Sequence, residues 1–218
     1  MSSAAHYRFN PTMFTFRQFA VDDSMTAMKV GTDGVLLGAW AAGGTRILDI
    51  GTGSGLIALM MAQRFPQALV TAIDIDADAC RQAVANAAAS PFGSRITVVN
   101  ASLQDFAATA MPQSFDAIVS NPPYFQNSLL SPDARRTAAR HTASLSFRDL
   151  MGGVRRLLAD GGVISVIGPA DAESDMEGEA IISGMSVAAT VAVSTRQGKR
   201  PRRFMARLVN GPATTYDH

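Results

Sequence analysis

The chain of 218 residues has little cysteine and little histidine, and each scarcity excludes a kind of site. Cys80 is the only cysteine, so neither an intramolecular disulfide nor a cysteine-based zinc site can form. A chain without disulfides suits a reducing compartment, and we expect the cytoplasm. The three histidines are scattered along the sequence, and we predict no metal site.

The sequence also lacks the apolar runs that insertion into a membrane requires. Its run from Leu56 to Ala62 is far too short to span a bilayer, and the N-terminus shows no basic segment followed by an apolar one. We therefore expect no membrane partner. Nothing in the sequence indicates an obligate protein partner, and we expect a monomer.

Charge of either sign is sparse. Charged residues make up 17% of the chain and the net charge is +1, so no overall field attracts nucleic acid, which would need a local basic patch. Because 47% of the residues are hydrophobic, the sequence predicts a globular fold with a full core. We expect one domain over residues 14–210, with a hairpin extension at 14–31 and flexible ends at 1–13 and 211–218.

What the sequence does contain is an alternation of strand and helix patterns from about Arg46 onward. Predicted strands lie at 47–50, 68–73, 96–100, 115–120, 163–167, 187–194 and 204–209, and predicted helices at 34–41, 56–65, 77–88, 147–158 and 172–183. This order predicts an α/β fold with a mainly parallel sheet and an antiparallel pair of strands at one edge. Residues 14–30 are predicted to form a β-hairpin that turns at 22–24.

Local details of two helices also follow from the pattern. Thr32 or Asp33 can cap the helix at 34–41, whose N-terminus is then a candidate anion site. In the helix at 77–88, the apolar spacing places Val84 on the inner face.

An Asn-Pro-Pro-Tyr tetrapeptide follows the apolar run 115–120. That run is typical of a buried parallel strand, so the tetrapeptide should lie at the strand's carboxyl end, where open α/β sheets bind their ligands. Pro122 and Pro123 fix φ and donate no backbone hydrogen bond. The segment is therefore expected to be a stiff rim that presents the Asn121 amide and the Tyr124 phenol.

A second motif is a glycine-rich turn between the first predicted strand of the alternation and its helix. Gly51, Gly53 and Gly55 let the backbone approach a ligand closely. The dinucleotide-binding pattern needs glycine or alanine where Leu56 stands, which disfavours a NAD-dependent oxidoreductase. The alternative is a tight turn without a ligand.

Two carboxylates flank this turn. Asp49 precedes the first glycine by two residues, where it would repel a pyrophosphate but would suit a ligand with an ammonium group. Asp74 ends the second predicted strand, where it can accept hydrogen bonds from both hydroxyls of a ribose. Ammonium and ribose together describe S-adenosylmethionine better than a dinucleotide. The alternative is that these aspartates only cap helices.

Beside a methyl donor, the tetrapeptide can bind the exocyclic amino group of adenine. That nitrogen is a poor nucleophile because its lone pair is delocalised into the ring. The Asn121 side chain and the Pro122 backbone carbonyl can accept hydrogen bonds from its two N–H groups, which exposes the lone pair, while Tyr124 can stack on the base. These three are the predicted catalytic residues; the alternative is a strand-terminating turn.

Two basic segments are candidates for RNA contacts. Residues 196–203 include five basic residues and no acid, enough for a handful of phosphate contacts, although a solvated hairpin tip has the same composition. A second group, Arg135, Arg136 and Arg140, follows the tetrapeptide; isolated surface arginines are the alternative there.

Taken together, these motifs resemble those of class I S-adenosylmethionine-dependent methyltransferases that modify amino groups through an Asn-Pro-Pro-Tyr motif. The similarity covers roughly Phe14 to Val209, and segments 16–19, 28–40, 48–60 and 120–125 look like the bacterial tRNA(Val) adenine N6-methyltransferase family. The resemblance implies a Rossmann-like fold with a twisted sheet and helices on both of its faces. It also implies S-adenosylmethionine as cofactor and methylation of the adenine just 3′ of the anticodon of a valine tRNA.

The resemblance and the two basic segments give the predicted site residues. The cofactor is expected to contact Lys29, Gly31, Thr32, Asp33, Asp49, Gly51, Thr52, Gly53, Gly55, Asp74 and Asn121. The tRNA is expected to contact Pro123, Tyr124, Phe125, Arg135, Arg136, Arg140, Lys199, Arg200, Arg202 and Arg203. Many relatives carry an acidic residue after the third strand to meet the cofactor's adenine. The aligned position here holds Ser102, with Asp105 three residues on, and both are candidates for that contact.

Three other functions share parts of this pattern. A protein glutamine-amide methyltransferase would use the same tetrapeptide, but it needs an N-terminal helical domain that the short N-terminal segment cannot supply. A DNA adenine methyltransferase would need a separate recognition region. A non-catalytic RNA-binding module would keep the basic segment without needing Asn121 or Asp49, and both are present.

Overall fold

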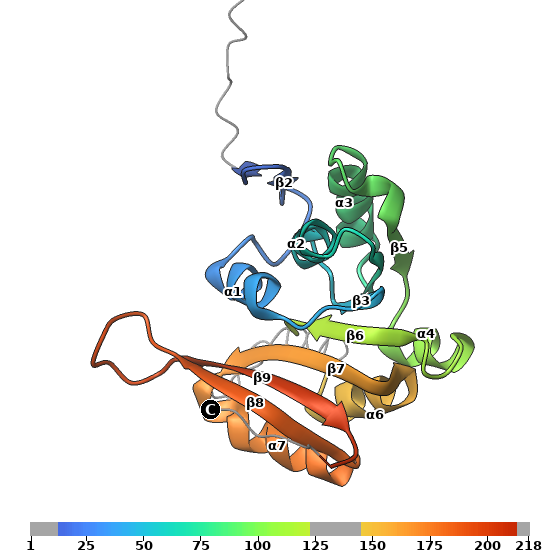
Figure 1. Cartoon of the computed structure of the whole chain (residues 1–218). Helices are drawn as coiled ribbons and strands as arrows, with labels where there is room; N and C mark the ends of the chain where they lie inside the picture. Colours follow the sequence, from blue (N-terminus) through green and yellow to red (C-terminus); the bar gives the residue numbers. More distant parts are fainter. Residues whose placement is uncertain (1–12, 123–144, 213–218) are drawn as a thin grey trace, which may run out of the picture.

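A seven-stranded sheet forms the centre of the structure, a computed structural model that describes residues 13–122 and 145–212 (Figure 1). The strands are β1 (Met13–Thr15), β2 (Ala20–Asp22), β3 (Arg46–Ile50), β4 (Leu69–Asp74), β5 (Ile96–Asn100), β6 (Phe115–Ser120), β7 (Leu158–Pro169), β8 (Met185–Val193) and β9 (Arg203–Asn210). The α-helices are α1 (Thr32–Trp40), α2 (Leu56–Arg64), α3 (Ala77–Ala88), α4 (Leu103–Thr109), α6 (Phe147–Leu157) and α7 (Glu173–Ile182). Strands β1 and β2 form a separate antiparallel hairpin.

The strand order in the main sheet is β5-β4-β3-β6-β7-β9-β8. Strands β5 to β7 in this order are parallel, whereas β9 is antiparallel to both of its neighbours. The predicted mainly parallel sheet with an antiparallel pair at one edge is confirmed. Ile50, which ends β3, pairs with Ile73 of β4 and Ser120 of β6. The turns that follow these three strands therefore meet at one edge of the sheet.

Helices cover both faces of the sheet, because successive residues of a strand point to opposite sides. Ile47 of β3 lies in a core cluster with residues of α1 and α2. The next residue, Leu48, lies in a second cluster with residues of α4, α6 and α7. The central strands are continuous apolar runs because both of their faces are buried, and each fully buried aliphatic side chain stabilises the fold by roughly 1.5–3 kcal/mol.

The N-terminal hairpin turns earlier than predicted. Phe16 N–H donates to the carbonyl of Phe19, 2.8 Å away, and the two rings stack with centroids 4.7 Å apart, so the turn lies between these residues. The second predicted strand, over residues 25–30, is wrong. Those residues form a loop because the buried Asp23 carboxylate accepts a hydrogen bond from Val30 N–H at 2.8 Å.

The start of α1 also differs from the prediction. The N-cap residue is Gly31, and no side chain caps the helix, so capping by Thr32 or Asp33 is wrong. The Asp33 carboxylate instead forms an ion pair with Arg203, at 2.7 Å. A partner that distant in sequence is invisible to a local capping rule.

Helix α4 has no counterpart among the predicted elements. Its N-cap is Ser102, whose hydroxyl oxygen accepts from Asp105 N–H at 3.0 Å and donates to the Asp105 carboxylate at 2.7 Å. This Ser-x-x-Asp pair is a capping signal that the sequence contained. Leu103 and Ala107 bury the inner side of the helix.

In α3, the assignment of Val84 to the inner face is wrong, because the side chain is 52% exposed. Its neighbour Ala83 packs against the backbone of Gly55, and one residue further along the helix points about 100° away. Residues 1–12 and 213–218, most of the predicted flexible ends, lie outside the described residues. Within the two described ranges, no helix is long and apolar enough to cross a membrane.

Candidate functional site

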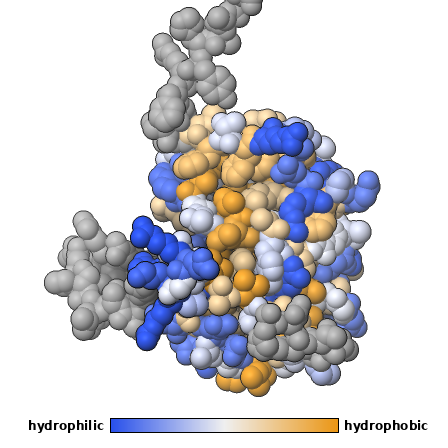
Figure 2. Space-filling model, turned by 60° about the vertical axis from the view of Figure 1, so that its left-hand side comes forward, coloured by the Kyte–Doolittle hydropathy of each residue, from blue (hydrophilic) through white to orange (hydrophobic). Residues whose placement is uncertain are grey.

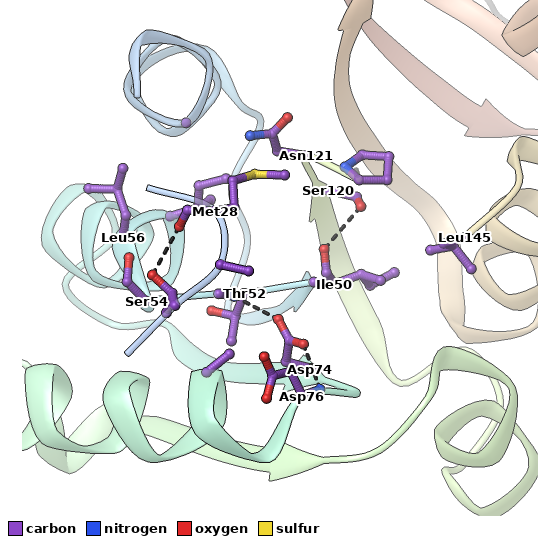
Figure 3. Close-up of a pocket in the computed structure, with 18 of the residues that line it drawn as sticks. Met28, Ile50, Thr52, Ser54, Leu56, Asp74, Asp76, Ser120, Asn121 and Leu145 are labelled. Carbon is purple, nitrogen blue, oxygen red and sulfur yellow. Dashed lines mark hydrogen bonds between the residues drawn. The ribbon is translucent and has the colours of Figure 1, made fainter. Parts of the chain in front are cut away.

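A cavity of about 1270 Å³ opens where β3, β4 and β6 end. Its lining comes from the glycine turn after β3, from Asp74 at the end of β4, from Asn121 and Pro122 after β6, and from residues 26–34. Figure 3 shows Asp74 and Asn121 on opposite sides of this cavity. The sheet therefore brings together the two motifs that the sequence singled out.

Each glycine of the turn has a left-handed backbone conformation, with φ of 72° at Gly51, 56° at Gly53 and 82° at Gly55. A Cβ atom on Gly51 or Gly53 would meet no other atom within 4 Å, so the cavity can admit a ligand right up to this backbone. At Gly55 the requirement is structural, because a Cβ atom there would lie 3.2 Å from the Ala83 Cβ. Two of the three glycines thus fit a ligand-binding role.

Asp74 faces the cavity and also shapes the turn. One carboxylate oxygen accepts from Gly53 N–H at 2.8 Å, and the other accepts from Asp76 N–H at 2.9 Å. Each oxygen of a carboxylate has a further lone pair. The side chain is therefore fixed in place while it retains acceptor capacity for the two hydroxyls of a ribose.

Asp49 occupies a different position from the one its predicted role suggests. The side chain is fully buried and does not line the cavity. Its Oδ2 accepts from Thr52 Oγ1 at 2.7 Å and from Ala58 N–H at 3.1 Å, which ties the glycine turn to the start of α2. Its Oδ1 has no hydrogen-bond partner among the described residues. The buried side chain supports the turn, and its contact with a ligand ammonium stays a prediction.

We expect the buried Asp49 carboxyl to make the stability of the fold decrease with rising pH. Burial raises the pKa of this carboxyl from 3.8 to about 7 against the hydrogen bonds from Thr52 and Ala58, and the charge of Asp74 adds to the rise. The folded chain therefore holds the proton more tightly than the unfolded chain. The free energy of unfolding should decrease as the pH rises from about 4 to about 7, by about 4 kcal/mol at most, and then level off.

Urea denaturation at about pH 5 and about pH 8 measures this slope, which Asp49→Asn should largely remove because the amide does not titrate. Asp78→Asn is the matched control, since that carboxylate is exposed and should leave the slope unchanged. Equal slopes in the wild type and in Asp49→Asn would contradict the prediction.

Residues 23–31 form a strap along the cavity. The cavity is lined by Lys29, Gly31, Thr32 and Asp33, four residues whose contact with the cofactor stays a prediction. The ammonium of Lys29 donates to the Asp23 carbonyl oxygen at 2.6 Å, so in this structure it is directed at the strap itself.

Two polar residues, which hold the strap and the segments beside it, were not identified from the sequence. Asn86 donates from Nδ2 to the carbonyls of Asp22 and Ser54, and its Oδ1 accepts from Asp22 N–H. Gln82 accepts from Met25 N–H at 3.2 Å. Both are buried on the inner side of α3, four residues apart. The sequence did contain a signal for them, because polar residues four apart lie on the same face of a helix.

The rim after β6 is anchored to the neighbouring strand. Ser120 Oγ donates to the carbonyl of Ile50 at 3.0 Å, and Pro122 is buried. Between them, the partly exposed Asn121 lines the cavity. The remaining predicted residues of this region, Pro123, Tyr124, Phe125, Arg135, Arg136 and Arg140, lie outside the described residues.

The two candidates after β5 differ in position. Ser102 lines the cavity, whereas Asp105 does not. The Asp105 carboxylate accepts from the Ser102 hydroxyl, so it serves the cap of α4. Of the two, only Ser102 is placed to contact a ligand.

The predicted basic segment divides into two parts. Arg196, Lys199, Arg200 and Arg202 are exposed in the hairpin loop that connects β8 and β9, whereas Arg203 is the first residue of β9 and lines the cavity. Figure 1 shows this loop projecting from the sheet, and Figure 2, with that side turned forward, shows strongly hydrophilic residues gathered beside an apolar band.

Comparisons with known proteins identify the family. The Methyltransferase small domain model matches residues 24–167. The tRNA1(Val) (adenine(37)-N6)-methyltransferase of Phocaeicola vulgatus is 50% identical over 194 residues, covering 88% of this chain and 81% of the relative. The protein of the same name from Aeromonas hydrophila is 45% identical over 201 residues, covering 91% of this chain and 84% of the relative. The chain belongs to the tRNA1(Val) (adenine(37)-N6)-methyltransferase family.

A solved structure supports the fold of this methyltransferase. M. jannaschii TYW2 in complex with AdoMet matches with a TM-score of 0.61 at 10% identity, over 91% of this chain and 85% of that chain. At such low identity the likeness concerns the fold alone, and it confirms the Rossmann-like methyltransferase architecture. Among the residues described in this methyltransferase, no group of three or more His, Cys, Asp or Glu could hold a metal ion.

Proposed function

We propose that this methyltransferase transfers a methyl group from S-adenosylmethionine to the exocyclic N6 of adenine 37, the adenine just 3′ of the anticodon, in a valine tRNA. The observation that carries the proposal is the meeting of Asn121, the glycine turn and Asp74 around one cavity. The names of relatives at 45–50% identity support tRNA adenine as the substrate.

The residues of the cavity fit the proposed cofactor, which supplies a methyl group on a positively charged sulfur. Gly51 and Gly53 leave open space beside their backbone, as a bulky ligand requires. Asp74 can accept from the ribose hydroxyls, and the first turn of α1 offers its N–H groups to a carboxylate. The Asp49 carboxyl lies buried behind the turn, where a bound cation would favour its ionised form.

Asn121 and Pro122 orient the adenine in this proposal. Their side-chain and backbone carbonyls accept from the two N–H groups of N6, which draws the nitrogen towards a tetrahedral shape. The nitrogen lone pair then forms a bond to the methyl carbon as the carbon–sulfur bond breaks. The nitrogen loses its proton to solvent after it is alkylated, so no strong general base is needed. The rate comes from alignment and from stabilising the positive charge that develops on nitrogen.

Mass spectrometry of the modified nucleoside tests the proposal. Purified protein is incubated with S-adenosylmethionine and with total tRNA from a strain that lacks the enzyme. The expected product is N6-methyladenosine at position 37 of a valine tRNA, the position that the relatives' name specifies. Methylation confined to another nucleotide, or no methylation of the tRNA, would reject it.

We propose that the exposed basic residues of the β8–β9 loop contact the tRNA backbone. Two hydrogen bonds order this loop, from Lys199 N–H to the Arg196 carbonyl and from Ser194 Oγ to the Lys199 carbonyl. Cations held on a projecting loop suit phosphates, because binding them releases counterions from the RNA.

Changing Lys199, Arg200 and Arg202 together to Ala is therefore expected to weaken tRNA binding and to flatten its dependence on salt. With three phosphate contacts removed, the negative slope of log K against log [salt] should become shallower by about two to three. Fluorescence anisotropy with labelled tRNA at several salt concentrations measures it. A slope equal to that of the wild type would show that the loop does not contact phosphate.

We further propose that the enzyme acts as a monomer in the cytoplasm, where tRNA is available. The near-absence of cysteine and the tRNA-modifying relatives support this location. Light scattering of the purified protein should give the mass of one chain, and a dimer mass would reject the monomer.

A further inference from the structure

Arg203 is held inward at the edge of the cofactor cavity. Its Nε donates to Asp33 Oδ2 at 2.7 Å, and its Nη1 donates to the Arg202 carbonyl at 2.9 Å. The side chains of Arg203 and Asp33 are only 38% and 32% exposed. By contrast, Arg202 and the basic residues before it are exposed. The charge run that is continuous in sequence is therefore divided in space.

The backbone at Arg203 is fixed from both sides. This residue pairs with Pro169 of β7 and with Val193 of β8, so it lies within the sheet rather than in the projecting loop. The preceding residue is held as well, because Arg202 N–H donates to the Val193 carbonyl and its own carbonyl accepts from Ala170 N–H. Arg203 cannot follow the loop outward to an RNA backbone without breaking these pairings.

The partner of Arg203 lies in the first turn of α1, which lines the same cavity. The first N–H groups of a helix have no partner within the helix, and a carboxylate in the first turn can fold back over them. The N-cap residue of α1 is Gly31, which has no side chain, and no side-chain hydrogen bond caps the helix. The Asp33 carboxylate is instead drawn away by Arg203, and its negative charge is neutralised.

We propose that Arg203 is a positioning residue of the cofactor site and not a phosphate contact. By holding Asp33, it keeps the N–H groups of the first turn of α1 available to the amino-acid end of S-adenosylmethionine. The inference rests on the proposed cofactor, and it removes Arg203 from the RNA-binding group that the sequence suggested.

Isothermal titration calorimetry with S-adenosylmethionine, without tRNA, tests the proposal directly. Arg203→Gln is expected to weaken binding about five-fold, the upper range for a partly exposed ion pair. Arg203→Lys, which keeps the charge, should restore part of the affinity. Arg202→Gln is the matched control, one residue away and exposed, and should bind the cofactor like the wild type.

A double-mutant cycle shows whether Arg203 acts through Asp33. In an Asp33→Ala background, Arg203→Gln should have no further effect on cofactor affinity, because the side chain that it positions is gone. A further five-fold loss in that background would overturn the proposed route. The melting temperature of each variant shows whether the fold is retained, and rescue by lysine separates positioning from general loss of structure.

Binding of tRNA tests the second part of the proposal, that Arg203 does not contact phosphate. Arg203→Gln should leave the salt dependence of tRNA binding unchanged, and steady-state assays should show a raised KM for the cofactor with the KM for tRNA unaltered. Unchanged cofactor affinity together with a flatter salt slope would overturn the proposal and make Arg203 a phosphate contact. If the wild type itself bound no S-adenosylmethionine, the proposed function would fail instead.

Discussion

Asn121→Ala is expected to lower the rate of methyl transfer about 1000-fold while changing cofactor affinity by no more than about two-fold. In the proposed mechanism the side chain provides one of the two carbonyls that accept from the reacting amino group, so its loss should act on the transition state. The surrounding backbone should stay in place, because Ser120 Oγ is bonded to the Ile50 carbonyl and Pro122 is buried. Single-turnover assays with saturating tRNA, alongside calorimetry of cofactor binding, separate the two effects.

Asn121→Asp is the matched comparison for this variant. The carboxylate keeps an acceptor at the same position, so transfer should recover well above the rate of the alanine variant. If the alanine variant transferred methyl at the rate of the wild type, the proposed role of the amide would be rejected. A rate equally low in both variants would show that the acceptor is not the property that matters.

Asp74→Ala is expected to reduce cofactor affinity about 100-fold. In the proposed site the carboxylate accepts two hydrogen bonds from the ribose, and hydrogen bonds to a charged group contribute about 1.5–3 kcal/mol each. The change also releases Gly53 N–H, which Asp74 holds at 2.8 Å, so the turn that meets the ligand loses support. Both effects act on binding in the same direction.

Calorimetry against Asp78→Ala gives the control for this loss. Asp78 is exposed, lies in the first turn of α3 four residues further along the chain and does not line the cavity, so the same charge is removed without touching the site. Its affinity for the cofactor should match that of the wild type. If Asp74→Ala bound as tightly as Asp78→Ala, the assignment of Asp74 to the ribose would be rejected.

The parallel strands could be predicted closely because both of their faces are buried. Strands β5 and β6 have the predicted bounds, and the convergence of the glycine turn, Asp74 and Asn121 followed from the rule that parallel strands end at the same edge. These predictions needed only local apolar pattern and chain order, which are properties that a sequence contains.

Other features depend on partners that a local pattern cannot reveal. The uncapped start of α1 reflects an ion pair between Asp33 and Arg203, which are 170 residues apart. Asp49 is buried because residues pack on both sides of β3. A carboxylate expected to face the ligand therefore lies behind the turn. Asn86 illustrates the same limit, since its three bonds join α3 to two segments that precede it in the chain.

The strand order of the sheet has a consequence during translation. Strand β9 comes last in the chain, yet it is inserted between β7 and β8, and its first residue, Arg203, lines the cavity. The glycine turn and Asn121 are synthesised long before it. A growing chain on the ribosome therefore has most of the residues that line the cavity but not the arginine that neutralises Asp33. The pocket acquires this arginine only after the chain has been synthesised as far as residue 203, well after the other residues that line it.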